Sequence, residues 1–511
     1  MRQQRNYKRH ALPVSRVCFC FMYTDQMTAV LSGARGLTLT RIAVIFLFVL
    51  AIFLFRHTWP TATAPATAPD LLTHDHAELV THPSSPSPLP SHETGTDHVE
   101  ASSHHVNDTC LHLPGADKVM IMLKTGATEL YQKLPTHFVT TLKCIPHFIV
   151  FSDLEQSFAD TKIHDAIKPV SKKVREKHED FNMYREIEKW HAEGQDLGKL
   201  MGDSGWNLDK WKFLPMFHET FENAPDHIQW FVMIEADTSL HWLNLLLWLQ
   251  SMDHQQPYYL GAQNVIGDTT FAHGGSGIVV SRKAADILEA ARYNAGKELY
   301  DEKWEDQTAM SCCGDEIIAR AFKAVDIPLT PAWPLIQGET ISTVDFTERH
   351  WCTPPITFHH VSPIEVDTYW QFQIDWAAEH GWRTPYLYRD IFEHFLGRHV
   401  TVNRTSWNNL SNDQRFVSAS LTGQDDTVFS ELEPHQQKAT ESEEWCAEAC
   451  VIEGDKCIQW MFTPGRCHLG RDIRFGKSDE REDEHWRSGW IQERIDQFRK
   501  SQEGCKINWR G

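Results

Sequence analysis

A run of bulky apolar residues followed at once by two carboxylates constrains the fold of this chain most. Residues 230–234, Trp-Phe-Val-Met-Ile, carry no charge and are typical of a strand covered on both faces. Glu235 and Asp237 follow, and Thr238 or Ser239 is then expected to cap a helix with apolar residues at helical spacing. The carboxylates therefore fall at the carboxyl end of a predicted central strand, where open α/β sheets bind ligands. The alternative is that Asp237 only caps the helix.

Strand-like and helix-like segments alternate between residues 117 and 395. Residues 118–126 and 147–153 are typical of strands, whereas residues 127–142 and 211–224 have helical periodicity. This βαβ order predicts a mostly parallel sheet with helices on both faces. Neither a G-x-G-x-x-G motif nor a Walker loop follows the first strand, which disfavours dinucleotide-binding and P-loop proteins.

Two later clusters also carry candidate functional residues. Gly274, Gly275 and Gly277 precede a predicted strand and helix, and glycines there let a backbone approach a bound sugar or phosphate. The alternative is an ordinary flexible turn. Asp315 and Glu316 precede an apolar helical face, where they are either functional carboxylates or first-turn acids favoured by the helix dipole.

A histidine pair follows a short predicted strand, as His359 and His360. Adjacent residues of a strand face opposite sides, so we expect at most one of them to reach a given site.

Seven motifs, taken in order, resemble the family 31 glycosyltransferases, in particular the Fringe-like and core 1 β1,3-galactosyltransferase group and its fungal members. The resemblance covers about residues 115–365 and rests on VMIMLKTGATE, HFIVFSD, WKFLPM, WFVMIEADTSL, GGSGIVVSR, CGDEIIAR and FHHV. It implies a GT-A fold, which is Rossmann-like with a mostly parallel sheet. It also implies a UDP-sugar donor, Mn²⁺ or Mg²⁺, and inversion of the anomeric configuration.

The family's D-x-D motif is Glu-Ala-Asp in this chain. Glu235 replaces the first Asp and Ala236 the middle residue, while Asp237 matches the last. The resemblance makes Asp237 a metal ligand together with His359 or His360, between which the sequence does not choose. Glu235 is expected to reach the metal through water or to contact the ribose.

The family's Glu-Asp motif after a cysteine is Cys313-Gly314-Asp315, so the Glu is lost. An acceptor hydroxyl needs a general base, for which Asp315 is the first choice and Glu316 the reserve. The glycine motif of the family is matched by Gly274, Gly275 and Gly277. The remaining candidates for donor binding lie at predicted strand ends or at the start of a helix: Lys124, Thr125, Gly126, Asp153 and Lys212.

An uninterrupted apolar run, residues 42–55, lies behind a leader that carries seven arginines and lysines against one acid. We expect an uncleaved transmembrane anchor over residues 37–58, with a cytoplasmic tail (1–36) and the remainder in the lumen. A cleaved signal peptide is the alternative. Residues 59–109, rich in Pro, Ser and Thr, are predicted to form a disordered stem. A short span suits Golgi or ER membranes.

Ten cysteines follow the apolar run, which agrees with an oxidising lumen. Residues 441–511 resemble a PAN/apple module, a small α+β domain stapled by disulfides, which implies the nested pairs Cys446–Cys467 and Cys450–Cys457. Such modules bind carbohydrate or protein, and a purely structural cap is the alternative. The sequence does not decide the bonding state of Cys505. It pairs with Cys312 or Cys313, forms a disulfide between two chains, or stays a free thiol.

The predicted organisation is a glycosyltransferase domain at residues 110–410, a linker at 411–440 and the PAN/apple-like module. We expect an inverting, UDP-sugar-dependent hexosyltransferase that acts on a hydroxyl of a glycan or glycoprotein and forms a β1,3 linkage. The alternative is a membrane-tethered carbohydrate- or protein-binding protein that has lost catalysis, which is favoured by the PAN-like tail and by Ala236 and Gly314, since both depart from the family motifs. A net charge of -20 argues against nucleic acid as a partner.

Overall fold

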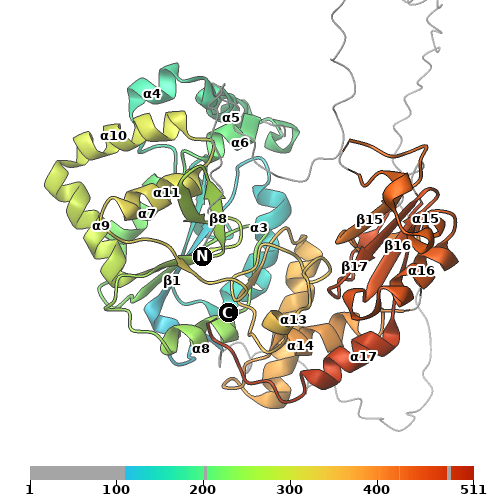
Figure 1. Ribbon diagram of the computed structural model, residues 1–511. Coiled ribbons are helices and arrows are strands. Elements are labelled where there is room, and N and C mark those ends of the chain that lie inside the picture. Colours follow the sequence, from blue (N-terminus) through green and yellow to red (C-terminus); the bar gives the residue numbers. More distant parts are fainter. Residues whose placement is uncertain (1–109, 201–203, 402, 425, 480–484, 511) are drawn as a thin grey trace, which may run out of the picture. The chain divides into compact units, whose positions relative to one another are not determined.

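The computed structural model describes residues 110–510 except 201–203, 402, 425 and 480–484 (Figure 1). The predicted tail, anchor and stem, residues 1–109, lie outside the described residues. Among the helices of the described part, none is long and apolar enough to cross a membrane.

A mixed sheet of eight strands forms the centre of the α/β region, in the order β11-β7-β10-β5-β1-β2-β4-β3. β1 pairs in parallel with both β2 and β5, whereas β10 runs antiparallel between β5 and β7. The predicted mostly parallel α/β fold is therefore confirmed. The strands are β1 (Val119–Lys124), β2 (Phe148–Ser152), β3 (Gln156–Phe158), β4 (Thr161–Asp165), β5 (Trp230–Glu235), β7 (Tyr259–Gly261), β10 (Ile278–Ser281) and β11 (Thr330–Pro331).

The apolar run that was predicted as a central strand is β5, which lies between β1 and β10. Its side chains alternate between two cores because successive residues of a strand face opposite sides of the sheet. Trp230, Val232 and Ile234 pack into one core, and Phe231 and Met233 into the other. Burial on both faces explains why this strand has no polar position before its end.

Helices cover both faces of the sheet (Figure 1). α3, α8 and α13 contribute to the first core, and α7, α9, α10 and α11 to the second. The helices are α3 (Leu130–Val139), α4 (Lys172–Lys177), α5 (Asn182–Ala192), α6 (Ser204–Asp209), α7 (Phe213–Asn223), α8 (Trp242–Gln250), α9 (Arg282–Ala295), α10 (Lys297–Met310), α11 (Gly314–Lys323), α12 (Glu348–Trp351), α13 (Pro363–His380) and α14 (Tyr388–Ile391).

The segment after β5 differs from the prediction that Thr238 or Ser239 caps a helix. Ser239 and Leu240 form a short strand, β6 (Ser239–Leu240), which pairs antiparallel with β12 (Thr357–Phe358). The helix α8 begins only at Trp242, with His241 at the N-cap position. Pairing with a strand over a hundred residues away outweighs the local capping preference, and it brings the histidine pair next to the end of β5.

The C-terminal region contains a five-stranded antiparallel sheet in the order β13-β19-β16-β17-β15. Residues 411–440, predicted to be a linker, contribute the edge strand β15 and the helix α15 to this region. Its elements are β13 (Arg404–Thr405), β14 (Trp407–Asn408), β15 (Gln414–Val417), α15 (Pro434–Ala439), α16 (Glu443–Ile452), β16 (Gln459–Thr463), β17 (Arg466–Gly470), β18 (Lys477–Ser478), β19 (Arg487–Trp490) and α17 (Gln492–Ser501).

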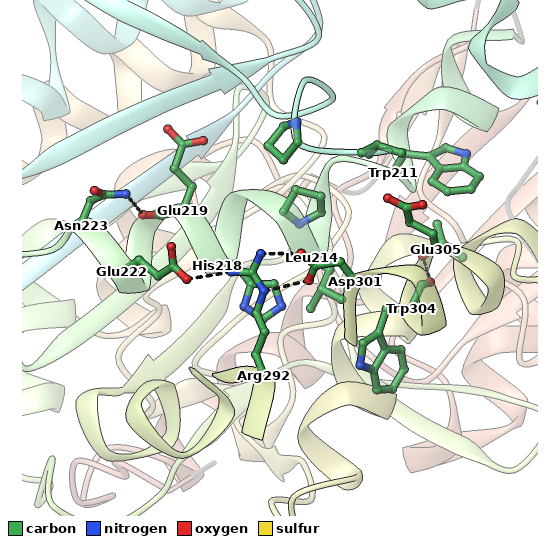
Figure 2. A pocket seen from close by; sticks show the side chains of 14 residues that line it. Trp211, Leu214, His218, Glu219, Glu222, Asn223, Arg292, Asp301, Trp304 and Glu305 are labelled. Atoms are coloured by element: carbon green, nitrogen blue, oxygen red, sulfur yellow. Dashed lines mark hydrogen bonds and ion pairs between the residues drawn. The ribbon is translucent and has the colours of Figure 1, made fainter. Parts of the chain in front are cut away.

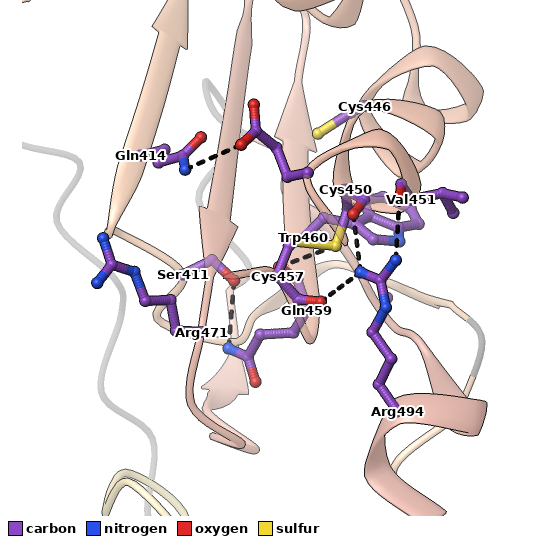
Figure 3. Close-up of a disulfide and its surroundings, with 12 residues drawn as sticks. Ser411, Gln414, Cys446, Cys450, Val451, Cys457, Gln459, Trp460, Arg471 and Arg494 are labelled. Atoms are coloured by element: carbon purple, nitrogen blue, oxygen red, sulfur yellow. Dashed lines mark hydrogen bonds between the residues drawn. A yellow bond between two sulfur atoms is a disulfide. The ribbon is translucent and has the colours of Figure 1, made fainter. Parts of the chain in front are cut away.

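Four disulfides are present among the described residues. Cys446–Cys467 joins α16 to β17, and Cys450–Cys457, seen in Figure 3, joins α16 to the segment just before β16. Both pairs match the prediction. Cys110–Cys144 was not predicted.

The expected alternatives for Cys505 were wrong, because Cys505 pairs with Cys352 over a separation of 153 residues. The helix α17 precedes Cys505 and leads the chain towards Cys352. Phe498 of α17 packs edge-on against Trp351, the neighbour of Cys352. Cys312 and Cys313 instead lie with their sulfur atoms 2.7 Å apart.

Candidate functional site

The carboxyl ends of β1 and β5 meet as a pair of charged residues. Lys124 and Glu235 are direct partners in the parallel register, and Lys124 Nζ lies 3.2 Å from Glu235 Oε1. The same ammonium lies 2.5 Å from Asp209 Oδ2 of α6. Two residues predicted from strand ends are thus brought together at one edge of the sheet.

Lys212 lies in a second set of ion pairs beside the first. Its Nζ is 3.1 Å from Asp153 Oδ2 and 3.1 Å from Asp209 Oδ1, and it donates to the backbone oxygen of Thr125 at 3.0 Å. Asp153 also accepts from the amide of Ala127 at 2.6 Å. Lys212 is only 3 % exposed, so these carboxylates hold it inside the protein. Its role is therefore to fix the loop after β1, rather than to reach freely into solvent.

The charges of this cluster stabilise one another. Burial by itself lowers the pKa of Lys124 and Lys212, but the neighbouring carboxylates outweigh it and the pKa of both is raised. Burial opposes ionisation of Asp209 too, yet the two lysines lower its pKa to about 2. The three groups therefore stay charged at neutral pH.

Asp237, His359 and His360 form a group of potential metal ligands. One ligand atom from each lies within 4.8 Å of the others. Asp237 Oδ1 is 3.4 Å from His359 Nε2, and its Oδ2 is 3.2 Å from Lys133 Nζ. Burial would raise the pKa of the Asp237 carboxyl, but His359 and Lys133 outweigh it and hold the pKa well below its usual range. One carboxylate and two imidazoles suit Mn²⁺ or another divalent transition metal.

The expectation that only one of the two histidines reaches the site was wrong. β12 ends at Phe358, so both histidines lie beyond the strand and strand alternation no longer applies. His360 has a positive φ of 59°, which turns the chain back. The rings consequently lie 3.8 Å apart at their centroids and on the same side as Asp237.

The glycine loop, residues 274–277, packs tightly against the potential metal ligands. A Cβ at Gly275 would lie 2.2 Å from the ring of His359, and one at Gly274 would lie 2.9 Å from Phe213. Gly277 adopts a φ of 110°, which side-chain-bearing residues rarely reach. The glycines were predicted to admit a bound sugar or phosphate. In this structure Gly274 and Gly275 instead make room for two side chains of the protein itself, those of Phe213 and His359.

Asp315 and Glu316 face different partners at the start of α11. Asp315 Oδ2 accepts from the amide of Gly274 at 2.9 Å, which ties it to the glycine loop. Glu316 instead accepts hydrogen bonds from Ser311 Oγ and from Arg320, whose Nη2 lies 2.6 Å from Glu316 Oε1. Only Asp315 is therefore connected to the loop that packs on His359.

Burial raises the pKa of Asp315 to about 7. The amides of Gly274 and Glu316 stabilise the charged form, and the negative charge of Glu235 opposes it. A carboxyl that titrates near neutrality is suited to accept a proton from a substrate.

Five residues that contact this site were not found from the sequence. Lys133 pairs with Asp237, and His137 Nε2 lies 2.8 Å from the backbone oxygen of Ala236. Thr238 Oγ1 accepts from the amide of Glu235 and donates to the oxygen of Gly275. Asp209 joins the two buried lysines, and the ring of His273 packs against that of His359.

Weak signals for some of these were present. Lys133 and His137 are one helical turn apart on the helix after the first strand, so they share a face. His273 directly precedes the glycines. Asp209 had no distinguishing pattern, because its contacts join residues that are distant in sequence.

A family model described as Fringe-like matches residues 116–330. The matched segment contains β1, β5, the glycine loop and Asp315, while the histidine pair and the C-terminal region lie beyond it. The match indicates a glycosyltransferase domain and is consistent with a UDP-sugar donor. A search of curated proteins found no match.

Proposed function

We propose that this protein is a metal-dependent, inverting hexosyltransferase that moves a sugar from a UDP-sugar to a hydroxyl of a glycan or glycoprotein, forming a β1,3 linkage. The grouping of Asp237, His359 and His360 at the carboxyl edge of the sheet carries this proposal. The Fringe-like match over residues 116–330 supports the reaction class. The resemblance to family 31 supports inversion and the linkage.

Asp237, His359 and His360 would hold the metal. Their ligand atoms are already close, and Asp237 remains ionised over the physiological range because its pKa is depressed. When bound, Mn²⁺ would supply positive charge that stabilises a departing diphosphate, and Mg²⁺ is the weaker candidate because it prefers oxygen ligands to imidazole. Lys133 contacts the same carboxylate through Oδ2, so its positive charge competes with a cation for Asp237.

The nucleotide would occupy the edge formed by the loop after β1. Lys124, Thr125, Gly126 and Glu235 surround this edge, and Thr125 Oγ1 is buried without a hydrogen-bond partner among the described residues. Asp153 and Lys212 position the loop from behind through their ion pair. The free hydroxyl of Thr125 can therefore serve a ligand.

Asp315 would act as the general base. Its carboxylate is held by two backbone amides and therefore has a fixed direction. With a pKa of about 7, a substantial fraction is ionised at neutral pH and can accept the proton of the acceptor hydroxyl. The hydroxyl oxygen then attacks the anomeric carbon from the face opposite to UDP, which inverts the configuration.

The alternative proposal, a binding protein without catalysis, rests on Ala236 and Gly314. The position of Gly314 has a structural reason, because a Cβ there would lie 2.4 Å from Phe213 and 2.5 Å from the backbone oxygen of Lys210. A side chain is excluded by packing at this position. The loss of the family's Glu therefore does not by itself favour loss of activity.

The cellular setting is also proposed. The disulfides support an oxidising compartment. We place residues 110–410 in the lumen of the Golgi or ER as the catalytic domain, held by a type II anchor at residues 37–58. The C-terminal PAN/apple-like module would bind carbohydrate or protein.

A donor screen tests the proposal. The detergent-solubilised full chain is incubated with UDP-Gal, UDP-GlcNAc or UDP-Glc and Mn²⁺, with or without simple glycoside acceptors, and UDP release is measured. We expect one donor to be turned over, and chelation by EDTA to stop the reaction. Binding of UDP without turnover of any donor would favour the alternative.

A further inference from the structure

A pocket of about 240 Å³ lies among α7, α9 and α10, and it shares no residue with the metal group or the glycine loop (Figure 2). α7 separates it from Gly274, because Phe213 at the start of this helix contacts the glycine while Leu214 and Pro215 line the pocket. The pocket is therefore a distinct site.

Part of the pocket wall is apolar. The indoles of Trp211 and Trp304 line it together with Leu214 and Pro215, and Figure 2 shows the two indoles on the same side of the pocket. Both tryptophans are nearly buried, at 2 % and 4 % exposure. Only a small part of each indole is therefore accessible, and this part forms a rigid, apolar section of the wall.

The charged side chains of the wall already have partners within the protein. Arg292 forms a bidentate pair with Asp301 and also contacts Glu222. Glu305 accepts from the amide and the hydroxyl of Ser171, each at 2.6 Å. Four carboxylates line the pocket against one arginine, so an anionic ligand is disfavoured. Their spare oxygen lone pairs can accept hydrogen bonds from a neutral ligand.

Two buried polar atoms of the pocket residues make no hydrogen bond of normal geometry among the described residues, although Trp304 interacts with the hydroxyl of Tyr300. They are Nε2 of His218 and Nε1 of Trp304, on side chains that are 3 % and 4 % exposed. The indole N–H can only donate. His218 Nδ1 faces Glu289 Oε1, and donation to that carboxylate leaves Nε2 as an acceptor.

We propose that this pocket binds a neutral saccharide ring. A sugar hydroxyl both accepts and donates, which matches the indole N–H and the imidazole nitrogen, and its other hydroxyls can donate to the carboxylates. The apolar C–H groups of a pyranose can contact the small accessible part of the two indoles. The site goes beyond the proposed transfer reaction and would hold a sugar remote from the reacting centre.

The test is binding of methyl β-glycosides of galactose, glucose, mannose and N-acetylglucosamine to the full chain, measured by saturation-transfer NMR and titration. We expect at least one to bind, and Trp304→Phe to weaken it on the order of tenfold through the lost hydrogen bond. Trp242→Phe is the matched control, since its buried indole N–H also makes no hydrogen bond of normal geometry among the described residues but lies on α8, outside the pocket.

Glu305→Ala is the second variant, because this half-buried rim side chain is less needed for folding, and it should also weaken binding. Asp237→Ala should leave glycoside binding unchanged, whether or not the protein transfers sugar. The proposal is overturned if no glycoside binds, if both Trp304→Phe and Glu305→Ala bind as the parent does, or if Asp237→Ala abolishes binding.

Discussion

At the scale of single residues, the two acids at the start of α11 differ more than their sequence suggests. Asp315 turns to the glycine loop, whereas Glu316 pairs with Arg320. Both were candidates because carboxylates in a first helical turn look alike in sequence. The resemblance put Asp315 first and Glu316 in reserve, whereas the contact that distinguishes them in the structure involves Gly274, which lies on a different element.

The pH dependence of turnover tests the role of Asp315. Because its pKa is about 7 and the base must be ionised, turnover should rise with pH up to about 7 and then level off. Asp315→Asn should lower turnover about 10²–10⁴-fold, the usual effect of losing a general base. Glu316→Gln is the control and should keep both rate and profile. An active Asp315→Asn protein would show that the base lies elsewhere.

The same titration affects stability, with a defined sign. Folding raises the pKa of Asp315 from 3.8 to about 7, so within this window the folded protein binds more protons than the unfolded chain. The free energy of unfolding contributed by this group therefore falls as pH rises through the window. Asp315→Asn should remove that part of the slope in urea unfolding, and an unchanged slope would contradict the assigned burial.

Lys133 occupies one oxygen of Asp237 and so competes with a cation for it. Lys133→Gln should therefore bind Mn²⁺ several-fold more tightly in the absence of nucleotide, as measured by isothermal titration. Lys143→Gln, a lysine without an ion pair to Asp237, is the control. Weaker Mn²⁺ binding by Lys133→Gln would mean that this side chain supports the site rather than competing for it.

At the scale of elements, the strands β1, β2, β5 and β10 were predictable from their apolar runs, and the helices α3, α7, α9 and α11 from apolar residues at helical spacing. The short pairing of β6 with β12 was not. Each of these strands has only two residues, which is too short for a recognisable apolar pattern, and their pairing depends on contacts between distant parts of the sequence. This pairing is also what brings both histidines to Asp237, so the site depends on the least predictable element.

The glycine loop should be intolerant of even one methyl group beside the metal group. Gly275→Ala places its Cβ 2.2 Å from His359, so the ring must move. We expect Mn²⁺ affinity to fall roughly 10–100-fold, the usual effect of disturbing a ligand's support. Gly205→Ala, where nothing lies within 4 Å of the added Cβ, is the control. Equal Mn²⁺ affinity in both variants would refute the proposed packing role.

At the scale of the whole molecule, the C-terminal region and the residues around α12 share one apolar cluster. Phe346 and Trp351 pack in it with Trp490 and Ile495, although these pairs are over a hundred residues apart. The linker predicted at 411–440 was inferred from polar composition. That composition reflects an edge strand and exposed turns, so it could not reveal a shared core.

The disulfide Cys352–Cys505 closes a loop that spans this shared cluster. Cys505→Ser should lower the free energy of unfolding by about 2–5 kcal/mol, because the unfolded chain gains freedom. The double variant Cys352→Ser/Cys505→Ser should cost no more than either single variant, as measured by denaturant unfolding followed by fluorescence. Additive losses would indicate that the two cysteines do not form one bond.

The central claim is that Asp237 serves a metal-dependent transfer. Asp237 lies on a turn outside both cores of the sheet, so Asp237→Ala should still fold, although the loss of its contacts with His359 and Lys133 should lower the thermal midpoint slightly. The decisive measurement is UDP release from the preferred UDP-sugar by parent and Asp237→Ala proteins across a Mn²⁺ titration. We predict Mn²⁺-dependent turnover by the parent and none by the variant. Normal turnover by folded Asp237→Ala protein would contradict the account.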